Sequence, residues 1–135
     1  MRVLGLDVGD RRVGLALSDP TGLLASPFGF VERGPSDLAD IIRIAEENEV
    51  AEIVVGLPLS MSGDSGAQAG KVRGFIRELK SQTDLPIKTV DERLSTVQAQ
   101  GMLRQSGRRR DRDRGDIDAA AAAVILQAYL DYGKG

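Results

Sequence analysis

The chain has 135 residues and an ordinary globular composition, with 41% hydrophobic and 28% charged residues. This length is enough for one domain with a proper core and too short for two. No stretch approaches the roughly 18 uninterrupted apolar residues of a membrane span, and the N-terminal pattern is not that of a signal peptide. We therefore expect a single domain over residues 1–135, cytoplasmic and without membrane contact.

Two missing residue types limit the chemistry. The chain has no Cys and no His, so it has neither a thiolate nucleophile nor an imidazole base. The same absence argues against structural zinc. Carboxylate, hydroxyl, Lys and Arg chemistry remains, which suits Mg²⁺ or Mn²⁺.

The charge is unevenly distributed, although the net charge is only −2. Residues 104–114 hold six Arg and two Asp, a local excess of four positive charges. Arg is the residue type best suited to bidentate phosphate contacts. The segment is therefore either a solvated loop with internal Arg–Asp pairs or a phosphate-binding surface.

The periodicity of apolar residues predicts nine elements in chain order. Alternation and short apolar runs predict five strands, at about 2–8, 12–18, 23–32, 52–57 and 86–91. Helical periodicity predicts four helices, at about 37–48, 65–80, 95–105 and 117–131. Strand hairpins followed by alternating helices and strands indicate one α/β domain with a mixed sheet flanked by helices.

Local signals refine these boundaries. A tight turn joins the first two strands at residues 9–11, and Pro27 with Gly29 is expected to bend the third strand. Four residues are predicted to cap helix N-termini, namely Ser36, Ser65, Ser95 and Asp116. Gln68 and Gln98 complete capping boxes with Ser65 and Ser95.

Asp7 interrupts the apolar run of the first strand. Alternation places Asp7 and Gly5 on one face, with Leu4 and Leu6 on the other. Gly5 and Gly9 flank the carboxylate and leave room for a ligand or another backbone. Asp7 is thus either a metal ligand or a cap for the following turn.

Three further carboxylates come from distant parts of the chain. Asp91 and Glu92 close the strand over 86–91, and alternation allows only one of them to face Asp7. Asp118 lies in the first turn of the last helix, on the same face as Ala122, so it is expected near the sheet. The simpler alternatives are that Glu92 forms a surface ion pair and that Asp118 only favours the helix dipole.

Taken together, these carboxylates predict a shared cation site. A lone ionised carboxylate in a core is costly unless it is paired or bound to a metal. Carboxylates around one or two divalent ions are typical of metal-dependent phosphodiester hydrolysis. The glycine-rich loop over 56–66 and the Arg pair Arg11–Arg12 are candidate phosphate contacts. The alternative for Arg12 is that it is buried or paired in the following strand, so only one of the two Arg need contact the substrate.

Four segments resemble, in order, the motifs of the YqgF family, also called the RuvX family. These segments are GLDVGDRRVGLALSD (5–19), VVGLPLSMSGD (54–64), VDERLST (90–96) and IDAAAAAVILQAYLD (117–131). The family comprises pre-16S rRNA nucleases and is also described as Holliday junction resolvase-like. The resemblance implies a ribonuclease H-like α/β fold with a mixed five-stranded sheet flanked by helices.

The resemblance also implies functional residues. By position, the acidic site falls on Asp7, Glu92 and Asp118, with Asp91 as a reserve metal ligand, and the residue chemistry described above suits Mg²⁺ or Mn²⁺ at that site. The residues themselves, rather than the resemblance, suggest the nucleic-acid contacts, which are Arg11, Arg12, Ser60, Ser62, Arg93, Arg108, Arg109 and Arg110. Asp10 departs from the family pattern, which often has Thr or a similar residue there.

Three functions remain open from the sequence. The leading hypothesis is a nuclease that acts on pre-16S rRNA, with ribosomal assembly particles as a context. The second is a Holliday junction resolvase acting on branched DNA. The third is a non-catalytic nucleic-acid-binding module for ribosome assembly.

Overall fold

Five strands form where the alternating and apolar runs predict them. The computed structural model describes residues 1–58, 66–92 and 114–133. Its strands are β1 (Arg2–Val8), β2 (Arg12–Ser18), β3 (Ala25–Glu32), β4 (Val50–Leu57) and β5 (Ile87–Asp91). The helices it describes are α1 (Asp37–Glu47), α2 (Gly66–Lys80) and α4 (Arg114–Ala128), and α4 continues into a π-helical turn over Tyr129–Gly133.

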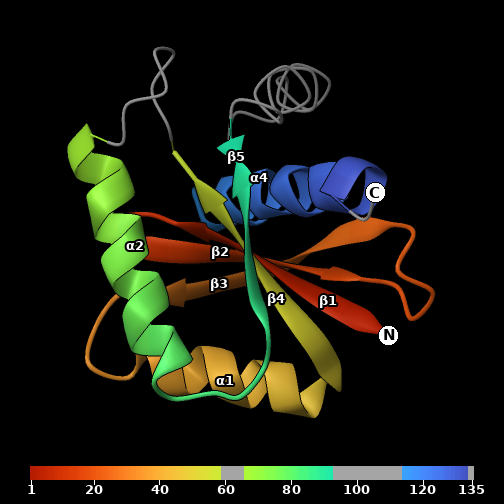
Figure 1. The fold of residues 1–135 in the computed structure, drawn as a ribbon, viewed down its shortest axis with the longest axis horizontal. Helices are drawn as coiled ribbons and strands as arrows, with labels where there is room; N and C mark the ends of the chain where they lie inside the picture. The colour runs from red at the N-terminus through yellow and green to blue at the C-terminus, as the bar shows by residue number, and fades with distance from the viewer. Residues whose placement is uncertain (59–65, 93–113, 134–135) are drawn as a thin grey trace.

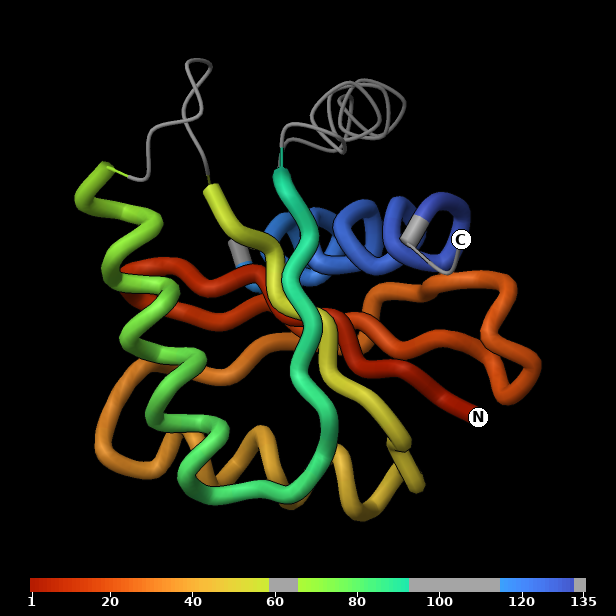
Figure 2. The backbone as a smooth tube through the Cα atoms, in the orientation of Figure 1, coloured from red at the N-terminus to blue at the C-terminus, as the bar shows by residue number. Residues whose placement is uncertain are grey.

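The strands form one mixed sheet in the order β3-β2-β1-β4-β5 (Figure 1). The β1–β2 and β2–β3 pairs are antiparallel, while the β1–β4 and β4–β5 pairs are parallel. Since parallel strands run the same way, β1, β4 and β5 end at the same edge of the sheet, which the backbone tube in Figure 2 makes easy to follow. That edge is where ligands bind in open α/β sheets.

The third strand is bent as predicted. Leu15 pairs with Gly29 and Ala16 with Pro27, so Phe28 has no opposite residue on β2. An extra residue of this kind is a β-bulge, which twists an edge strand. β3 and β5 are the two edges of the sheet that the structure describes.

Helices α1 and α2 cover one face of the sheet with large apolar side chains (Figure 1). Leu38 and Ile41 of α1, with Phe75 and Leu79 of α2, pack against Leu4, Leu6, Leu15, Ile53 and Val55 of the strands. Burial of a side chain of this size stabilises a fold by about 1.5–3 kcal/mol. This face therefore holds the main hydrophobic core.

Helix α4 covers the opposite face with small side chains. Ala122, Ala123 and Leu126 are buried against Ala16 and Val54 of the sheet. None of the helices that the structure describes combines the length and apolarity needed to cross a membrane.

Some predicted boundaries were wrong. β4 begins at Val50 rather than 52, and α4 begins at Arg114 rather than about 117 with Asp116 as its cap. Gly115 explains the longer helix, because a Cβ there would lie 2.4 Å from the Phe30 ring. Close packing of Gly115 against Phe30 of β3 therefore accompanies about one extra turn at the start of α4, which helix propensity alone did not predict.

Helix α1 begins after Ser36, as predicted, but the Ser36 hydroxyl makes no capping hydrogen bond. The carboxylate of Asp37, the first residue of the helix, instead accepts a hydrogen bond from the backbone N–H of Leu38 at 2.7 Å. It thus satisfies one of the unpaired N–H groups in the first turn of the helix. The predicted helix over 95–105 and the cap residue Ser65 lie outside the described residues.

Candidate active site

The site is organised by a glycine on β4, between two carboxylates. Leu6 of β1 pairs with Val55 of β4, so Asp7 and Gly56 are the next neighbours across these strands. A Cβ at Gly56 would lie 2.8 Å from Oε1 of Glu92. Because Gly56 has no side chain, Glu92 reaches across β4 from the end of β5 and forms a side-chain hydrogen bond with Asp7.

This pair has the electrostatics of a shared proton. Burial, followed by the charge of Asp7, the hydrogen bond to it and the charge of Asp91, raises the pKa of Glu92 to about 7. The pKa of Asp7 is also raised, first by burial and further by the charge of Asp118, although the Glu92 hydrogen bond opposes that rise. Glu92 is thus the member that keeps the proton and donates it to the Asp7 carboxylate, as two close carboxylates require.

Asp118 lies near this pair, but its carboxylate forms an ion pair with the guanidinium of Arg12. Nε of Arg12 lies 2.6 Å from Oδ2 of Asp118, and both side chains are less than one-third exposed. The sequence left open whether Arg12 is paired within the fold or contacts a phosphate, and in the structure it is paired with Asp118. Asp118 is still close enough to Asp7 to raise its pKa.

A second glycine positions Asp118. A Cβ at Gly14 of β2 would lie 2.0 Å from the backbone oxygen of Asp118. Any side chain at this position would push the first turn of α4 away from the sheet. Gly14 therefore fixes the height of Asp118 above β1 and β2.

Gly14 was not identified as a site residue from the sequence, and Gly56 was included only as the first residue of the candidate phosphate-binding loop. The available signal was a glycine inside an otherwise apolar strand, which often marks a close approach of another backbone or a ligand. Gly5, which was predicted to leave such room, lies beneath α4, where a Cβ would be 2.7 Å from Cβ of Leu126.

The arrangement fits a hard cation in its chemistry. Asp7 and Glu92 present oxygen ligands that now share a proton, and a divalent cation competes with protons for such ligands. Within the described residues, no group of three or more Asp or Glu side chains is arranged as a metal site. The carboxylate of Asp118 is instead paired with the guanidinium of Arg12.

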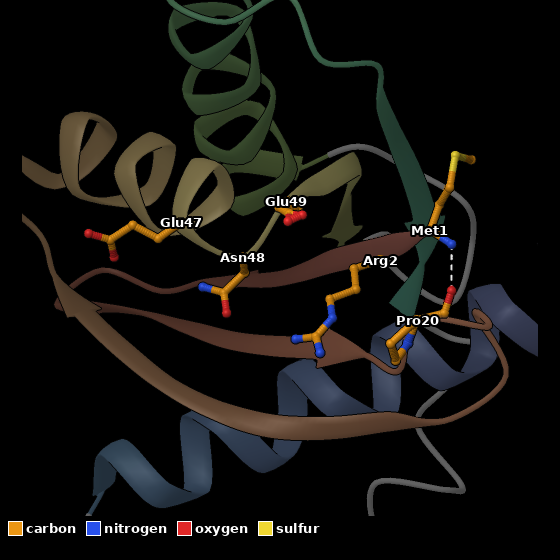
Figure 3. A pocket seen from close by; sticks show the side chains of 6 residues that line it. All are labelled: Met1, Arg2, Pro20, Glu47, Asn48 and Glu49. Carbon is orange, nitrogen blue, oxygen red and sulfur yellow. Dashed lines mark hydrogen bonds between the residues drawn. The ribbon is translucent and has the colours of Figure 1, made fainter.

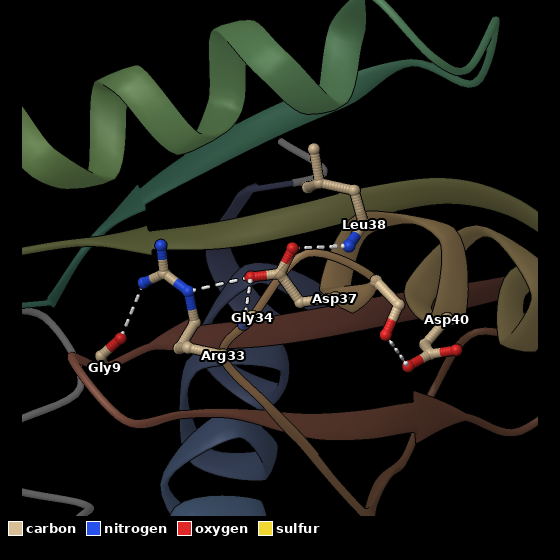
Figure 4. A network of polar contacts seen from close by, with 7 residues as sticks. Gly9, Arg33, Gly34, Asp37, Leu38 and Asp40 are labelled. Atoms are coloured by element: carbon tan, nitrogen blue, oxygen red, sulfur yellow. Dashed lines mark hydrogen bonds and ion pairs between the residues drawn. The ribbon is translucent and has the colours of Figure 1, made fainter.

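The turn that carries Asp7 into β2 is held by Arg33 (Figure 4). Nη1 of Arg33 donates to the carbonyl of Gly9 at 2.8 Å, and its Nε lies 3.0 Å from the Asp37 carboxylate. The guanidinium also stacks over the Phe75 ring at 5.2 Å. One side chain thus connects the β1–β2 turn to α1 and α2.

The neighbouring turn residues face outward. Asp10, whose role the sequence left open, lies 3.8 Å from Lys71 of α2, and both side chains are well exposed. Such a pair contributes little stability. Arg11 is exposed, which suits contact with a ligand in solution.

The other residues predicted to contact nucleic acid lie in parts of the chain that the structure does not describe. Ser60, Ser62, Arg93, Arg108, Arg109 and Arg110 lie outside the described residues. Asp91 is partly buried beside Glu92 at the end of β5.

Two cavities of about 520 Å³ are lined by residues other than Asp7, Glu92 and Asp118. One is at the opposite end of β1, lined by Met1, Arg2, Pro20, Glu47, Asn48 and Glu49 (Figure 3). It mixes acidic and basic side chains and lies far along β1 from Asp7. The other borders β5 and the π-helical turn.

Comparison with known proteins gives a consistent result. The family model described as "RuvX: Holliday junction resolvase" matches residues 1–132. A "Putative pre-16S rRNA nuclease" of Desulforamulus reducens is 48% identical over 135 residues, covering 98% of each chain. Another protein of that name, from Clavibacter michiganensis subsp. michiganensis, is 50% identical over 131 residues, covering 95% of this chain and 81% of its own.

The fold has a solved counterpart. RuvC of Thermus thermophilus, in complex with a Holliday junction substrate, superposes with a TM-score of 0.63 at 16% identity, covering 100% of this chain and 98% of RuvC. At that identity the likeness concerns the fold alone, which is ribonuclease H-like, as predicted. The family match and the near-half identity show more, and on that ground this chain belongs to the RuvX family.

Proposed function

We propose that this protein is a divalent-cation-dependent nuclease whose site is formed by Asp7, Glu92 and Asp118. The observation that supports it most directly is the hydrogen bond between Asp7 and Glu92 across Gly56. Two partly buried carboxylates that share a proton contribute little to stability, whereas a divalent cation would stabilise both in their ionised form. Family membership supports the reaction, since close relatives carry the name nuclease.

The residues around the cation would divide the work. Asp7 and Glu92 would bind it after losing their shared proton, and Asp118 would join them, with Asp91 in reserve. A bound Mg²⁺ or Mn²⁺ would polarise a phosphate oxygen and lower the pKa of a water molecule. Arg11, exposed on the β1–β2 turn, would contact the phosphate backbone of the substrate.

The substrate that we propose is the precursor of 16S rRNA, within assembling ribosomal particles in the cytoplasm. The names of the relatives at 48% and 50% identity support this choice. Branched DNA is the second candidate, because the family description and the RuvC counterpart refer to Holliday junctions. Contacts to the phosphate backbone carry no base code, so such contacts alone do not distinguish the RNA substrate from branched DNA.

One experiment tests the reaction and the substrate together. Purified protein and Asp7→Asn are incubated with a labelled RNA that carries the 5′ precursor region of 16S rRNA, in Mn²⁺, Mg²⁺ or EDTA. A labelled four-way DNA junction is treated in parallel. We expect metal-dependent RNA cleavage that Asp7→Asn abolishes.

The other outcomes decide between alternatives. Preferential junction cutting would assign the substrate to DNA. Binding of RNA by both proteins without cleavage would contradict the nuclease and favour a non-catalytic assembly module.

A further inference from the structure

A groove runs beside the edge strand β5, on the side of the sheet that α4 covers. Its walls come from β5 and from the end of α4 with the π-helical turn, and its volume is about 520 Å³. Its lining residues are Lys88, Thr89, Val90, Asp91, Ala128, Tyr129 and Tyr132. We call it the β5 groove. Its volume lies in the range of sites that take small organic ligands.

Both tyrosines of the chain line this groove. Tyr129 is fixed, since its hydroxyl donates to the carboxylate of Glu52 at 3.0 Å. Tyr132 is 65% exposed. One aromatic ring of the lining is therefore held in place, while the second is largely exposed to solvent.

The β5 groove leads to the carboxylates. Asp91, the last residue of β5, lines the groove, and the next residue, Glu92, belongs to the carboxylate pair. Strand alternation puts Lys88 on the same face of β5 as the buried Val90, and Glu92 follows directly after the last residue of the strand, within about 13 Å of Lys88 along the chain. A chain held at the site can thus continue along β5 without leaving this face.

The chemistry of the lining selects a nucleobase. Exposed aromatic rings stack on unpaired bases, whereas duplex bases are already stacked on one another. Lys88 is exposed and has no ion pair within the described part of the chain, so its ammonium is available to a phosphate. Asp91 would repel a phosphate but accept a hydrogen bond from a base amino group or a 2′-hydroxyl.

We propose that the β5 groove binds an unpaired nucleotide in a single-stranded flank of the substrate, with the base stacked on Tyr132 and the adjoining phosphate at Lys88. This subsite rests on the proposed nuclease function, which it extends from the scissile phosphate to its neighbouring strand. It gives the enzyme a preference for substrates with a single-stranded segment beside the cleavage position.

The test measures binding without cleavage. A fluorescein-labelled single-stranded RNA of mixed sequence is titrated in EDTA with wild type, Tyr132→Ala, Tyr132→Phe and Lys88→Gln, and binding is followed by fluorescence anisotropy. Phe28→Ala is the matched control, because Phe28 is a 47% exposed aromatic residue on the other edge of the sheet. Single-stranded DNA and double-stranded RNA of the same sequence are titrated in parallel.

We expect Tyr132→Ala to weaken single-stranded RNA binding about tenfold, since loss of one stacked base has an effect of this size. Tyr132→Phe and Phe28→Ala should bind like wild type, Lys88→Gln should bind more weakly, and duplex binding should change little. If Tyr132→Ala loses the same affinity for single-stranded DNA as for single-stranded RNA, the groove recognises the base alone. A larger loss for RNA would show that the groove also recognises the 2′-hydroxyl.

Unchanged binding by Tyr132→Ala, or an equal loss in Phe28→Ala, would overturn the subsite. The metal-dependent cleavage assay distinguishes this failure from that of the proposed function. If wild type cleaves RNA and Tyr132→Ala binds normally, only the subsite is wrong. If Tyr132 controls binding but no cleavage occurs, the nuclease is wrong and the groove stands, whereas absence of any binding by wild type contradicts both.

Discussion

The two faces of the sheet are built from different residues. The face under α1 and α2 is filled by Leu, Ile and Phe side chains, while α4 meets the other face through Ala on the helix and Gly on the strands. Large side chains give the first face its stability. Small ones on the second let a helix approach closely and leave space for carboxylates, so the site lies on the face with the smaller hydrophobic contribution.

The largest expected effect is a loss of stability from a substitution in the first face alone. Leu79→Ala removes a fully buried side chain of α2 and should lower the free energy of unfolding by about 3 kcal/mol. Urea unfolding measures the loss. Divalent-cation affinity of the folded protein should be unchanged, and a parallel loss of that affinity would show that the two faces are not separable.

Gly14→Ala breaks the second face at the point where α4 approaches most closely. The added Cβ would lie 2.0 Å from the Asp118 carbonyl, and overpacking of this kind costs about 2 kcal/mol. We expect lower stability together with weaker cation binding, because the first turn of α4 must move. Gly29→Ala on β3 is the control, since a Cβ there meets nothing within 4 Å.

The pH dependence of stability should differ between wild type and Glu92→Gln. The pKa of Glu92 is raised from 4.5 to about 7 in the folded protein. Its protonated form therefore stabilises the fold fully below about pH 4.5, and this contribution is lost as the pH rises to about 7. Denaturation of metal-free protein across this window should show wild type weakening relative to Glu92→Gln.

Parallel stability curves for the two proteins would contradict the shared proton. Addition of a divalent cation should reverse the trend, because the cation binds the deprotonated pair and stabilises the fold at the higher pH.

The smallest expected effect concerns Arg12. Nε of its guanidinium lies 2.6 Å from Oδ2 of Asp118, and this ion pair competes with a divalent cation for the carboxylate. Arg12→Gln should therefore raise divalent-cation affinity about threefold in the absence of nucleic acid, as expected for a partly buried ion pair worth about 1 kcal/mol or less. Calorimetric titration of both proteins measures this, and weaker binding by the variant would instead make Arg12 a support of the site.

The sequence predicted the strands, the mixed sheet and the face of Asp7, because these depend on alternation and short-range pattern. It limited Asp91 and Glu92 to one inward-facing residue, and the structure identifies Glu92. It left open the Arg12–Asp118 pair, which joins residues 106 positions apart and depends on how α4 lies across β2. The roles of Gly14 and Gly56 were missed for the same reason, since a glycine reveals a close approach only when its neighbour is known.

The measurement that tests the central claim most directly is a calorimetric titration of Mn²⁺ at about pH 6 in two buffers of different protonation enthalpy. If Asp7 and Glu92 hold the cation, wild type should bind it and release about one proton per ion, because the pKa of Glu92 is about 7 before binding. Asp7→Asn should lose that binding. Equal affinity in Asp7→Asn, or binding by wild type without proton release, would contradict the assignment of this carboxylate pair as the cation site.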